Sequence, residues 1–382
     1  MISSGLDKSF GGPPEAVTGA ACSLAKIGFS VSVAVFGQTL KSWNENHFRK
    51  DLEINSVRAI CFHAKSTSKY GGKIHLSEVR ILWNEIRNAD FITLHQLYNY
   101  QNVFATLIIR ILRKKFALMP HGTLTSYQNS KHSIRKFLVS PIFIAGIVSK
   151  ASLLFAATQT EKNEISVKWQ NKTKVVGLGY PTPQHKVELA SKNNECFTFV
   201  YMGRLAHKKR IDITLQALKM ATDIYKKPIK LVICGDGDES IVNLISQFAK
   251  SGGLLQIEYK GWVGGEEKEL ELSNADCFIL TSEDENFAIA VAEGLSFGLP
   301  SLVSNKVGLS ELIFRYKAGR VFSELKVEEI ANEAIQIMKS DLTLLSKNAL
   351  AASKELSWDH IARKWSQEIM AAFQPSSKIK VN

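Results

Sequence analysis

Apolar residues alternate along the chain between short β-rich runs and longer stretches with helical spacing. Residues 14–26 carry apolar residues at helical spacing, and Gly28 marks the end of this predicted helix. A β-rich run follows at Val31, Val33 and Val35. Further strand-like runs lie at residues 57–62, 91–94, 116–119, 153–156 and 174–178, with helical stretches between them. The first half of the chain therefore predicts repeated strand–helix units.

The alternation is interrupted once and then starts again. Residues 181–194 are polar and contain Pro181 and Pro183, which is typical of a linker. The strand-like runs after it are residues 197–202, 229–234, 257–259, 276–280 and 302–304, and the helical stretches include 212–225, 240–251 and 289–297. Two series of strand–helix units predict an α/β fold with two doubly wound parallel sheets.

The end of the chain predicts one more helix. Ser357 is a suitable N-cap, and an apolar stripe follows at Trp358, Ile361, Ala362, Trp365, Ile369 and Phe373. We therefore expect four parts: an N-terminal domain (1–183), a linker (184–195), a C-terminal domain (196–356) and a terminal helix (357–382).

Composition narrows the class of protein. The 382 residues are 45% hydrophobic and 22% charged, which excludes a disordered chain, a collagen-like fibre and a disulfide-stapled mini-protein. The five cysteines are scattered, so we expect buried thiols in a reducing cytosol. No apolar run approaches the roughly 20 residues of a membrane helix, and no cleavable signal is present. These features predict a cytoplasmic protein.

The excess positive charge of the chain lies in its first half. Residues 1–195 contain 25 Lys and Arg against 12 Asp and Glu, a net charge of +13, whereas residues 196–382 have a net charge of −1. Residues 101–150 contain eight basic residues and no acidic one, interleaved with apolar residues. This pattern favours contact with an anionic membrane or substrate. The alternatives are a solvated helix face and, as a rival partner, nucleic acid.

The strongest chemical motif runs from Glu285 through Glu293 to Pro300. A buried strand, a polar turn and a helix starting near Phe287 follow one another there. Free N–H groups at a helix start can hold a phosphate, and carboxylates can accept hydrogen bonds from sugar hydroxyls. The surrounding strand, turn and helix make the pair of glutamates a specific signal.

Three weaker motifs follow the same logic. Gly203 and Arg204 directly follow a strand, and Arg204 and Lys209 bracket a space where a diphosphate could be neutralised. Gly11 and Gly12 precede the first helix, where backbone can approach a ligand closely. His95 and His121 each end a strand, which is where ligands bind in open α/β sheets. An ordinary basic loop, a plain turn and structural histidines are the alternatives.

Taken in order, these motifs resemble those of glycosyltransferase family 4, the retaining glycosyl transferases group 1 with the GT-B fold. The resemblance runs from GGPPEAV through PHG, GRLAHKK, ICGDGD and KGWV to SEDENFAIAVAEGLSFGLP. It implies two facing Rossmann-like domains that enclose a cleft. The C-terminal domain would bind a nucleotide sugar and the N-terminal domain the acceptor, with the last helix crossing back to the N-terminal domain.

The resemblance also implies roles for residues. Arg204 and Lys209 would bind the diphosphate, and Glu293 the ribose. Glu285 would lie near the donor sugar, and His121 would contact the transferred sugar. Further donor contacts are implied for Gly12, Val263, Asn286, Phe287 and Ala288. No metal and no cofactor are expected, because protein cations would stabilise the leaving diphosphate.

The implied activity is retaining transfer of a sugar to a glycan or lipid-linked acceptor, with a role in cell-surface polysaccharide biosynthesis. The basic segment 101–150 would fit peripheral contact with the inner face of the cytoplasmic membrane, and nucleic acid is not an expected partner. A related GT-B enzyme such as a nucleotide-sugar epimerase and a non-catalytic basic binding protein are the alternatives.

Two positions depart from the family pattern. Only Met1 and Ile2 precede Ser3, so the first strand is expected to be clipped or very short. Arg210 stands where the family often has a glycine after the motif lysine.

Overall fold

The chain folds into two compact units. The computed structural model describes residues 1–3, 6, 12–38, 40–44, 46–63, 76–97, 100–124, 141–181 and 196–373. Unit 1 comprises Met1–Gly179 and Trp358–Asn382, and unit 2 comprises Tyr180–Ser357. Each contains one parallel sheet covered by helices, so the predicted α/β fold with two Rossmann-like sheets is confirmed. The expected linker 184–195 lies outside the described residues.

Unit 1 is built on a seven-stranded parallel sheet in the order β3-β2-β1-β4-β5-β6-β7. The strands are β1 (Ile2–Ser3), β2 (Ser32–Gln38), β3 (Arg58–His63), β4 (Ile92–His95), β5 (Phe116–Met119), β6 (Leu153–Ala156) and β7 (Thr173–Val175). Among the described residues, the first strand comprises only Ile2 and Ser3. It nevertheless lies inside the sheet, because Ile2 pairs with Ala34 of β2 and with Leu94 of β4. The strand order reverses at β1 and β4.

Helices cover both faces of this sheet. They are α1 (Pro13–Lys26), α2 (Leu40–Asn44), α3 (His47–Ile54), α4 (Leu76–Asn88), α5 (Tyr100–Ile111), α8 (Pro141–Lys150), α9 (Gln159–Glu164), α10 (Val167–Gln170) and α18 (Trp358–Phe373). Side chains alternate between the faces of a strand. Val33 and Val35 of β2 accordingly join one core cluster with α1 and α3, while Ala34 and Phe36 join the other.

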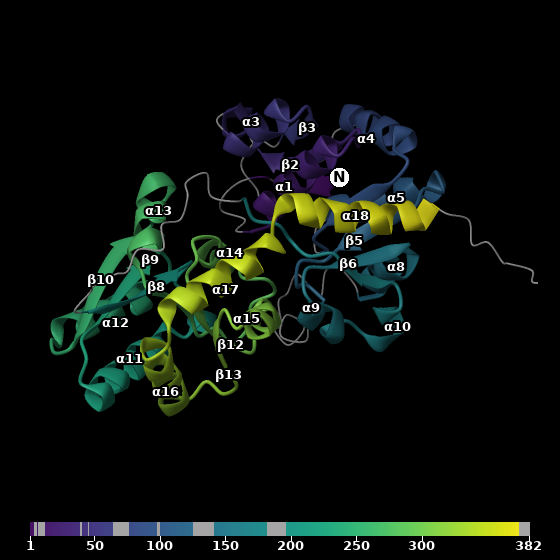
Figure 1. Cartoon of the computed structure of the whole chain (residues 1–382). Helices are drawn as coiled ribbons and strands as arrows, with labels where there is room; N and C mark the ends of the chain where they lie inside the picture. The colour runs from purple at the N-terminus through teal and green to yellow at the C-terminus, as the bar shows by residue number, and fades with distance from the viewer. Residues whose placement is uncertain are drawn as a thin grey trace, which may run out of the picture. The chain divides into compact units, whose positions relative to one another are not determined.

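The last helix of the chain returns to the first. Figure 1 shows α18 in yellow, and its buried residues include Ile361, Ala362 and Trp365. The contact with α1 is close at one point, because the indole of Trp358 occupies the space where a side chain at Gly19 would lie. The apolar stripe predicted from sequence is therefore the packing face of α18.

Unit 2 contains a six-stranded parallel sheet in the order β10-β9-β8-β11-β12-β13. The strands are β8 (Phe197–Met202), β9 (Ile229–Cys234), β10 (Leu255–Gly261), β11 (Cys277–Leu280), β12 (Ser301–Ser304) and β13 (Gly319–Phe322). The order reverses between β8 and β11. In open α/β sheets this switch point leaves a crevice beyond the carboxyl ends of the two strands, where ligands bind.

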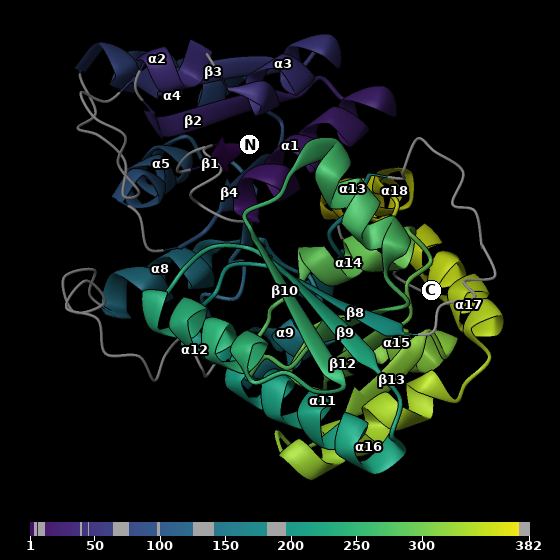
Figure 2. The ribbon, with the colours of Figure 1, turned by 90° about the vertical axis from the view of Figure 1, so that its left-hand side faces the viewer.

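The helices of unit 2 also form two layers. They are α11 (Ile211–Tyr225), α12 (Glu239–Lys250), α13 (Gly265–Asn274), α14 (Ile289–Ser296), α15 (Ser310–Tyr316), α16 (Val327–Met338) and α17 (Leu342–Lys354). Figure 2 shows α11, α12 and α16 on one side of the sheet and α13, α14 and α17 on the other. Helix α14 begins at Ile289, as the predicted stretch 289–297 does and two residues after the helix start expected near Phe287; Ala288 before it has a left-handed backbone (φ 71°).

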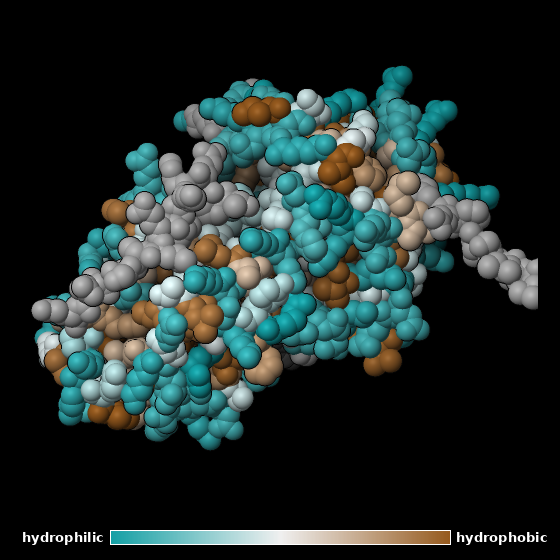
Figure 3. Space-filling view, in the orientation of Figure 1, coloured by the Kyte–Doolittle hydropathy of each residue, from teal (hydrophilic) through white to brown (hydrophobic). Residues whose placement is uncertain are grey.

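Most of the coloured surface on the face drawn in Figure 3 is hydrophilic. On the face drawn in Figure 3, hydrophobic side chains form small separate patches. Among the described residues, no helix combines the length and apolarity that crossing a membrane requires. All five cysteines are free thiols, and Cys22, Cys234 and Cys277 are buried.

The close approach of α18 to α1 leads to a stability prediction. Gly19→Ala should lower the free energy of unfolding by about 1–3 kcal/mol, because the new methyl group must displace the Trp358 indole. Gly146→Ala in α8 is the control: nothing lies within 4 Å of the added carbon. That variant should gain roughly 0.5–1 kcal/mol from the better helix former. Urea unfolding of both variants measures the difference, and equal stability would contradict this account of the helix contact.

Candidate functional site

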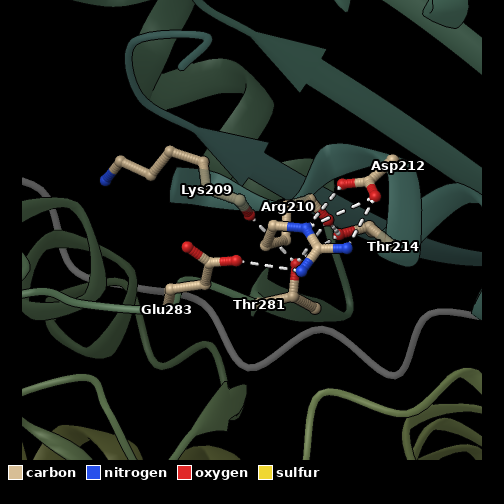
Figure 4. A network of polar contacts seen from close by, with 6 residues as sticks. All are labelled: Lys209, Arg210, Asp212, Thr214, Thr281 and Glu283. Carbon is tan, nitrogen blue, oxygen red and sulfur yellow. Dashed lines mark hydrogen bonds and ion pairs between the residues drawn. The ribbon is translucent and has the colours of Figure 1, made fainter. Parts of the chain in front are cut away.

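Two loops meet at the switch point of unit 2. The β8 loop (203–210) follows β8, and the β11 loop (281–288) follows β11. The backbone N–H of Glu283 donates to the Lys208 carbonyl at 2.8 Å. The hydroxyl of Thr281 donates to the carbonyls of Lys209 and Arg210 at 3.1 and 3.0 Å (Figure 4). Because β8 and β11 are neighbouring parallel strands, residues 70 positions apart in sequence are brought together here.

An ion pair between two lysines and one glutamate connects these loops. Lys209 Nζ lies 2.7 Å from Glu285 Oε1, and Lys208 Nζ lies 3.2 Å from the same oxygen. Burial alone would raise the pKa of Glu285, but Lys209 and Lys208 outweigh it and hold that pKa below its usual value. Burial lowers the pKa of Lys209, and the Glu285 carboxylate opposes this shift. Glu285 is thus held as a carboxylate between two cations.

Arg204 presents a third positive charge on the β8 loop. Its backbone is fixed by the phenol of Tyr201, which donates to the Arg204 carbonyl at 3.2 Å. Burial raises the pKa of Tyr201, so this phenol keeps its proton. The Arg204 side chain is exposed, and no carboxylate of the described residues forms an ion pair with it. Its charge lowers the pKa of Lys209, and both predicted diphosphate ligands lie on the β8 loop.

The loop after β9 supports the β8 loop by backbone contact. A side chain at Gly235 or Gly237 would collide with the carbonyls of Gly203 and Leu205, so only glycine fits there. The two aspartates between and after these glycines have structural roles. Asp236 accepts a hydrogen bond from Tyr259 at 3.2 Å, and Asp238 caps α12 through the Ser240 N–H at 3.0 Å.

Glu293 is buried in the second turn of α14. Its carboxylate accepts a hydrogen bond from the Tyr180 hydroxyl at 2.5 Å and forms an ion pair with Lys268 of α13. Two partners on different elements therefore orient this carboxylate. The other predicted donor contacts of unit 2 are a buried residue after β10 and three residues between Glu285 and α14: Val263, Asn286, Phe287 and Ala288.

Unit 1 holds the remaining two predicted residues. His121 follows β5, and its Nε2 lies 3.0 Å from Nδ1 of the buried His95 at the end of β4. The His95 ring also stacks on Trp365 of α18, with ring centroids 6.1 Å apart. Burial lowers the pKa of His121 to about 4 and the pKa of His95 well below its usual value. Both rings are therefore neutral at pH 7. Gly12 directly precedes α1.

A buried carboxylate fixes the turn that carries His121. Glu161 Oε1 accepts the N–H of Gly122 at 2.6 Å, and Oε2 accepts the N–H of Ala157 at 2.7 Å. Five residues that contact the predicted site residues were not predicted from the sequence: Glu161, Lys208, Tyr201, Tyr180 and Lys268. Lys208 lies next to Lys209 in the motif GRLAHKK, so this motif could have indicated it. The other four show no local pattern that marks a site.

Comparison with known families is consistent with this geometry. Residues 184–355 match the family described as "Glycosyl transferases group 1". This confirms the resemblance to group 1 that the motifs predicted, over slightly less than half of the chain. The matched residues contain both loops of the switch point and Glu293.

Curated relatives align over the same half of the chain. The O-antigen chain mannosyltransferase B of Escherichia coli is 25% identical over 166 residues, which cover 42% of this chain and 42% of that protein. The 2-deoxystreptamine N-acetyl-D-glucosaminyltransferase of Niallia circulans is 25% identical over 157 residues, which cover 41% and 39%. The chain thus spans less than half the length of these relatives.

Solved structures align over nearly the whole chain. Anabaena HepE in complex with UDP gives a TM-score of 0.72 at 17% identity, covering 97% of this chain and 98% of that one. The apo form of the lipopolysaccharide outer core galactosyltransferase WaaB gives 0.69 at 15% identity, with the same coverage. At this identity the likeness shows the fold, which is that of GT-B glycosyltransferases.

The histidine pair leads to a pH prediction. Unfolded histidines bind protons near pH 6.5, whereas folded His121 does so only near pH 4. The unfolded state therefore binds more protons in this window, and the free energy of unfolding should fall as pH falls from 6.5 to 4. The slope is at most about 1.4 kcal/mol per pH unit for each histidine.

Urea unfolding at several pH values measures this slope. His121→Gln should give a flatter pH dependence than the parent chain. His207→Gln is the control, because the side chain of His207 is 79% exposed, and it should keep the parent slope. The same slope in both variants would contradict a buried, neutral His121.

Proposed function

We propose that this chain is a retaining glycosyltransferase that moves a sugar from a nucleotide-diphosphate sugar to a glycan or lipid-linked acceptor in cell-surface polysaccharide biosynthesis. The observation that carries the proposal is the group of cations at the switch point of unit 2, where Lys209 and Lys208 surround Glu285 and Arg204 lies close by. The group 1 match over the same residues supports it.

The proposed chemistry requires stabilisation of the leaving diphosphate. Arg204 offers a planar fork of donors and Lys209 a point charge, and both would neutralise charge that grows as the glycosidic bond breaks. Lys209 can turn to the diphosphate without stranding a buried carboxylate, because Lys208 stays paired with Glu285. Protein cations would thus do the work of a metal, so the proposed reaction is metal-independent.

The remaining roles follow the family resemblance. The ribose hydroxyls would donate to Glu293, whose carboxylate is oriented by Tyr180 and Lys268. Val263 would flank the base, and residues 286–288 would contact the sugar and phosphate through their backbone. In unit 1, Gly12 would contact phosphate. Neutral His121 would contact the transferred sugar, which a ring with a pKa of about 4 can do without a charge at pH 7.

A donor panel tests the proposed activity. UDP-, GDP-, ADP- and dTDP-sugars are added separately, and thermal unfolding is followed. The donor at a hundred times its Kd should stabilise the fold by about 2.7 kcal/mol. Lys209→Met should weaken this binding roughly ten- to a hundredfold, because it removes a charge-assisted contact.

Lys230→Met serves as the control for Lys209→Met. Lys230 forms a half-exposed ion pair with Glu258 between β9 and β10 of the same unit. This variant should bind the donor as the parent chain does. Stabilisation by no member of the panel, or equal binding by the parent chain and Lys209→Met, would overturn the proposed role of the cations.

The proposal extends to peripheral contact with an anionic membrane through residues 101–150, at the inner face of the cytoplasmic membrane. Exposed side chains at the end of α5 support it: Leu107, Arg110, Ile111 and Arg113. Two other lysines of the segment cap helices instead. Lys114 donates to the Ala89 carbonyl at 2.9 Å and Lys115 to the Ala372 carbonyl at 2.6 Å. Residues 125–140 lie outside the described part of the chain.

Sedimentation with vesicles tests the membrane contact. The parent chain should bind vesicles that contain phosphatidylglycerol at low salt and be released at high salt, because basic residues are attracted to anionic headgroups. Ile111→Glu should weaken binding severalfold. Ile224→Glu in unit 2 is the control, since Ile224 is exposed to a similar degree, 58% against 66%. Equal binding by the two variants would contradict a role for α5.

A further inference from the structure

Arg210 has a backbone conformation that favours glycine. Its φ and ψ are 51° and 46°, in the left-handed region, where it joins the short 3-10 turn of residues 207–209 to α11. An L-residue in this region has a cost that glycine avoids. The family that the motifs resemble often has a glycine at this position. We therefore ask what the arginine side chain contacts.

The guanidinium of Arg210 connects α11 to the β11 loop. Its Nε lies 3.1 Å from Asp212 Oδ1 and its Nη2 lies 2.9 Å from Asp212 Oδ2, in a two-pronged contact. Its Nη1 lies 2.9 Å from Glu283 Oε1. Figure 4 shows this fork and the side chain of Lys209 pointing away from it. Arg210 thus pairs with Asp212 and Glu283, whereas Lys209 pairs with a different carboxylate, that of Glu285.

A second set of contacts fixes the backbone at the same point. The hydroxyls of Thr214 and Thr281 lie 2.7 Å apart, and both side chains are buried. The Thr281 hydroxyl also reaches the carbonyls of Lys209 and Arg210. The peptide units on either side of Arg210 are therefore held against the β11 loop while its guanidinium holds Glu283 from that loop.

We propose that Arg210 is a positioning residue that clamps the β8 loop to the β11 loop and so fixes Lys209 against Glu285. The proposal rests on the proposed function, in which Lys209 binds the diphosphate. Asp212 and Glu283 have side chains that are 40% and 37% exposed. Exposed ion pairs contribute little to stability. The clamp therefore acts on the geometry of the site, where a displacement of about 1 Å can cost a hundredfold in rate.

Substitutions at residue 210 separate this role from a structural one. Arg210→Gly keeps the backbone conformation and removes the fork. It should leave the melting temperature nearly unchanged while kcat/KM for the donor falls roughly ten- to a hundredfold. The KM for the acceptor should stay the same. Arg210→Lys keeps the charge but cannot form the fork, so it should not restore the rate.

Lys226→Gly is the matched control. Lys226 ends the same helix with the same left-handed backbone (φ 54°). This variant should keep the parent rate. The pair Arg210→Gly and Glu283→Gln should not be additive, because each removes the same contact.

Amide hydrogen exchange supplies a readout that needs no donor. Arg210→Gly should exchange faster in residues 207–210 and 281–285, whereas Lys226→Gly should not change these segments. If the parent chain binds no nucleotide sugar but exchange rises as stated, the clamp stands and the proposed function fails. Exchange that matches the parent chain, or a donor-binding protein in which Arg210→Gly keeps kcat/KM, would overturn the clamp.

Discussion

The buried ion pair of Lys209 with Glu285 is the constraint on which the rest of unit 2 depends. Removing two charges from water is costly, and their attraction offsets this cost only in good geometry. The geometry here requires two loops, each at the end of a different strand, to stay in register. Lys208 adds a second cation on the same carboxylate, so in the proposed reaction Glu285 would keep a partner when Lys209 turned to the diphosphate.

Much of the surrounding structure serves to hold these two loops. The glycines after β9 let the backbone of that loop approach the β8 loop closely, and the Tyr201 hydroxyl donates a hydrogen bond to the Arg204 carbonyl. Two buried threonine hydroxyls and the guanidinium of Arg210 add further contacts between the β8 loop, α11 and the β11 loop. Backbone groups and side chains both contribute to the contacts between the two loops. Rigid placement of cations is what stabilising a leaving diphosphate requires.

The predicted site of unit 1 is built around two neutral histidines. His95 and His121 contact each other, and burial keeps both rings neutral. The carboxylate of Glu161 accepts hydrogen bonds from two backbone N–H groups, which stabilise its charge. Trp365 of α18 packs on His95, which ties the end of the chain to the turn around His121.

Hydropathy alone predicted most of the strands and their order along the chain, although it gave no run for β13. Runs such as 116–119, 153–156, 197–202 and 229–234 match β5, β6, β8 and β9 residue for residue, because buried parallel strands are apolar throughout. Motif spacing also indicated Arg204, Lys209, Glu285 and Glu293, since these lie where a strand gives way to a loop or helix. The predicted stretch 289–297 starts at the first residue of α14, whereas no sequence pattern reveals the left-handed backbone of Ala288 before it.

Tertiary structure alone decided which partners each residue has. Glu161, Tyr180 and Lys268 lie far in sequence from the groups that they orient, and they meet them only through strand order and helix packing. From the sequence, Arg210 was recognised only as a departure from the glycine that the family often has. Its contact with Glu283 depends on β8 and β11 being neighbours in the sheet. Local pattern reports burial and turns, but long-range contacts arise only when separate segments pack together.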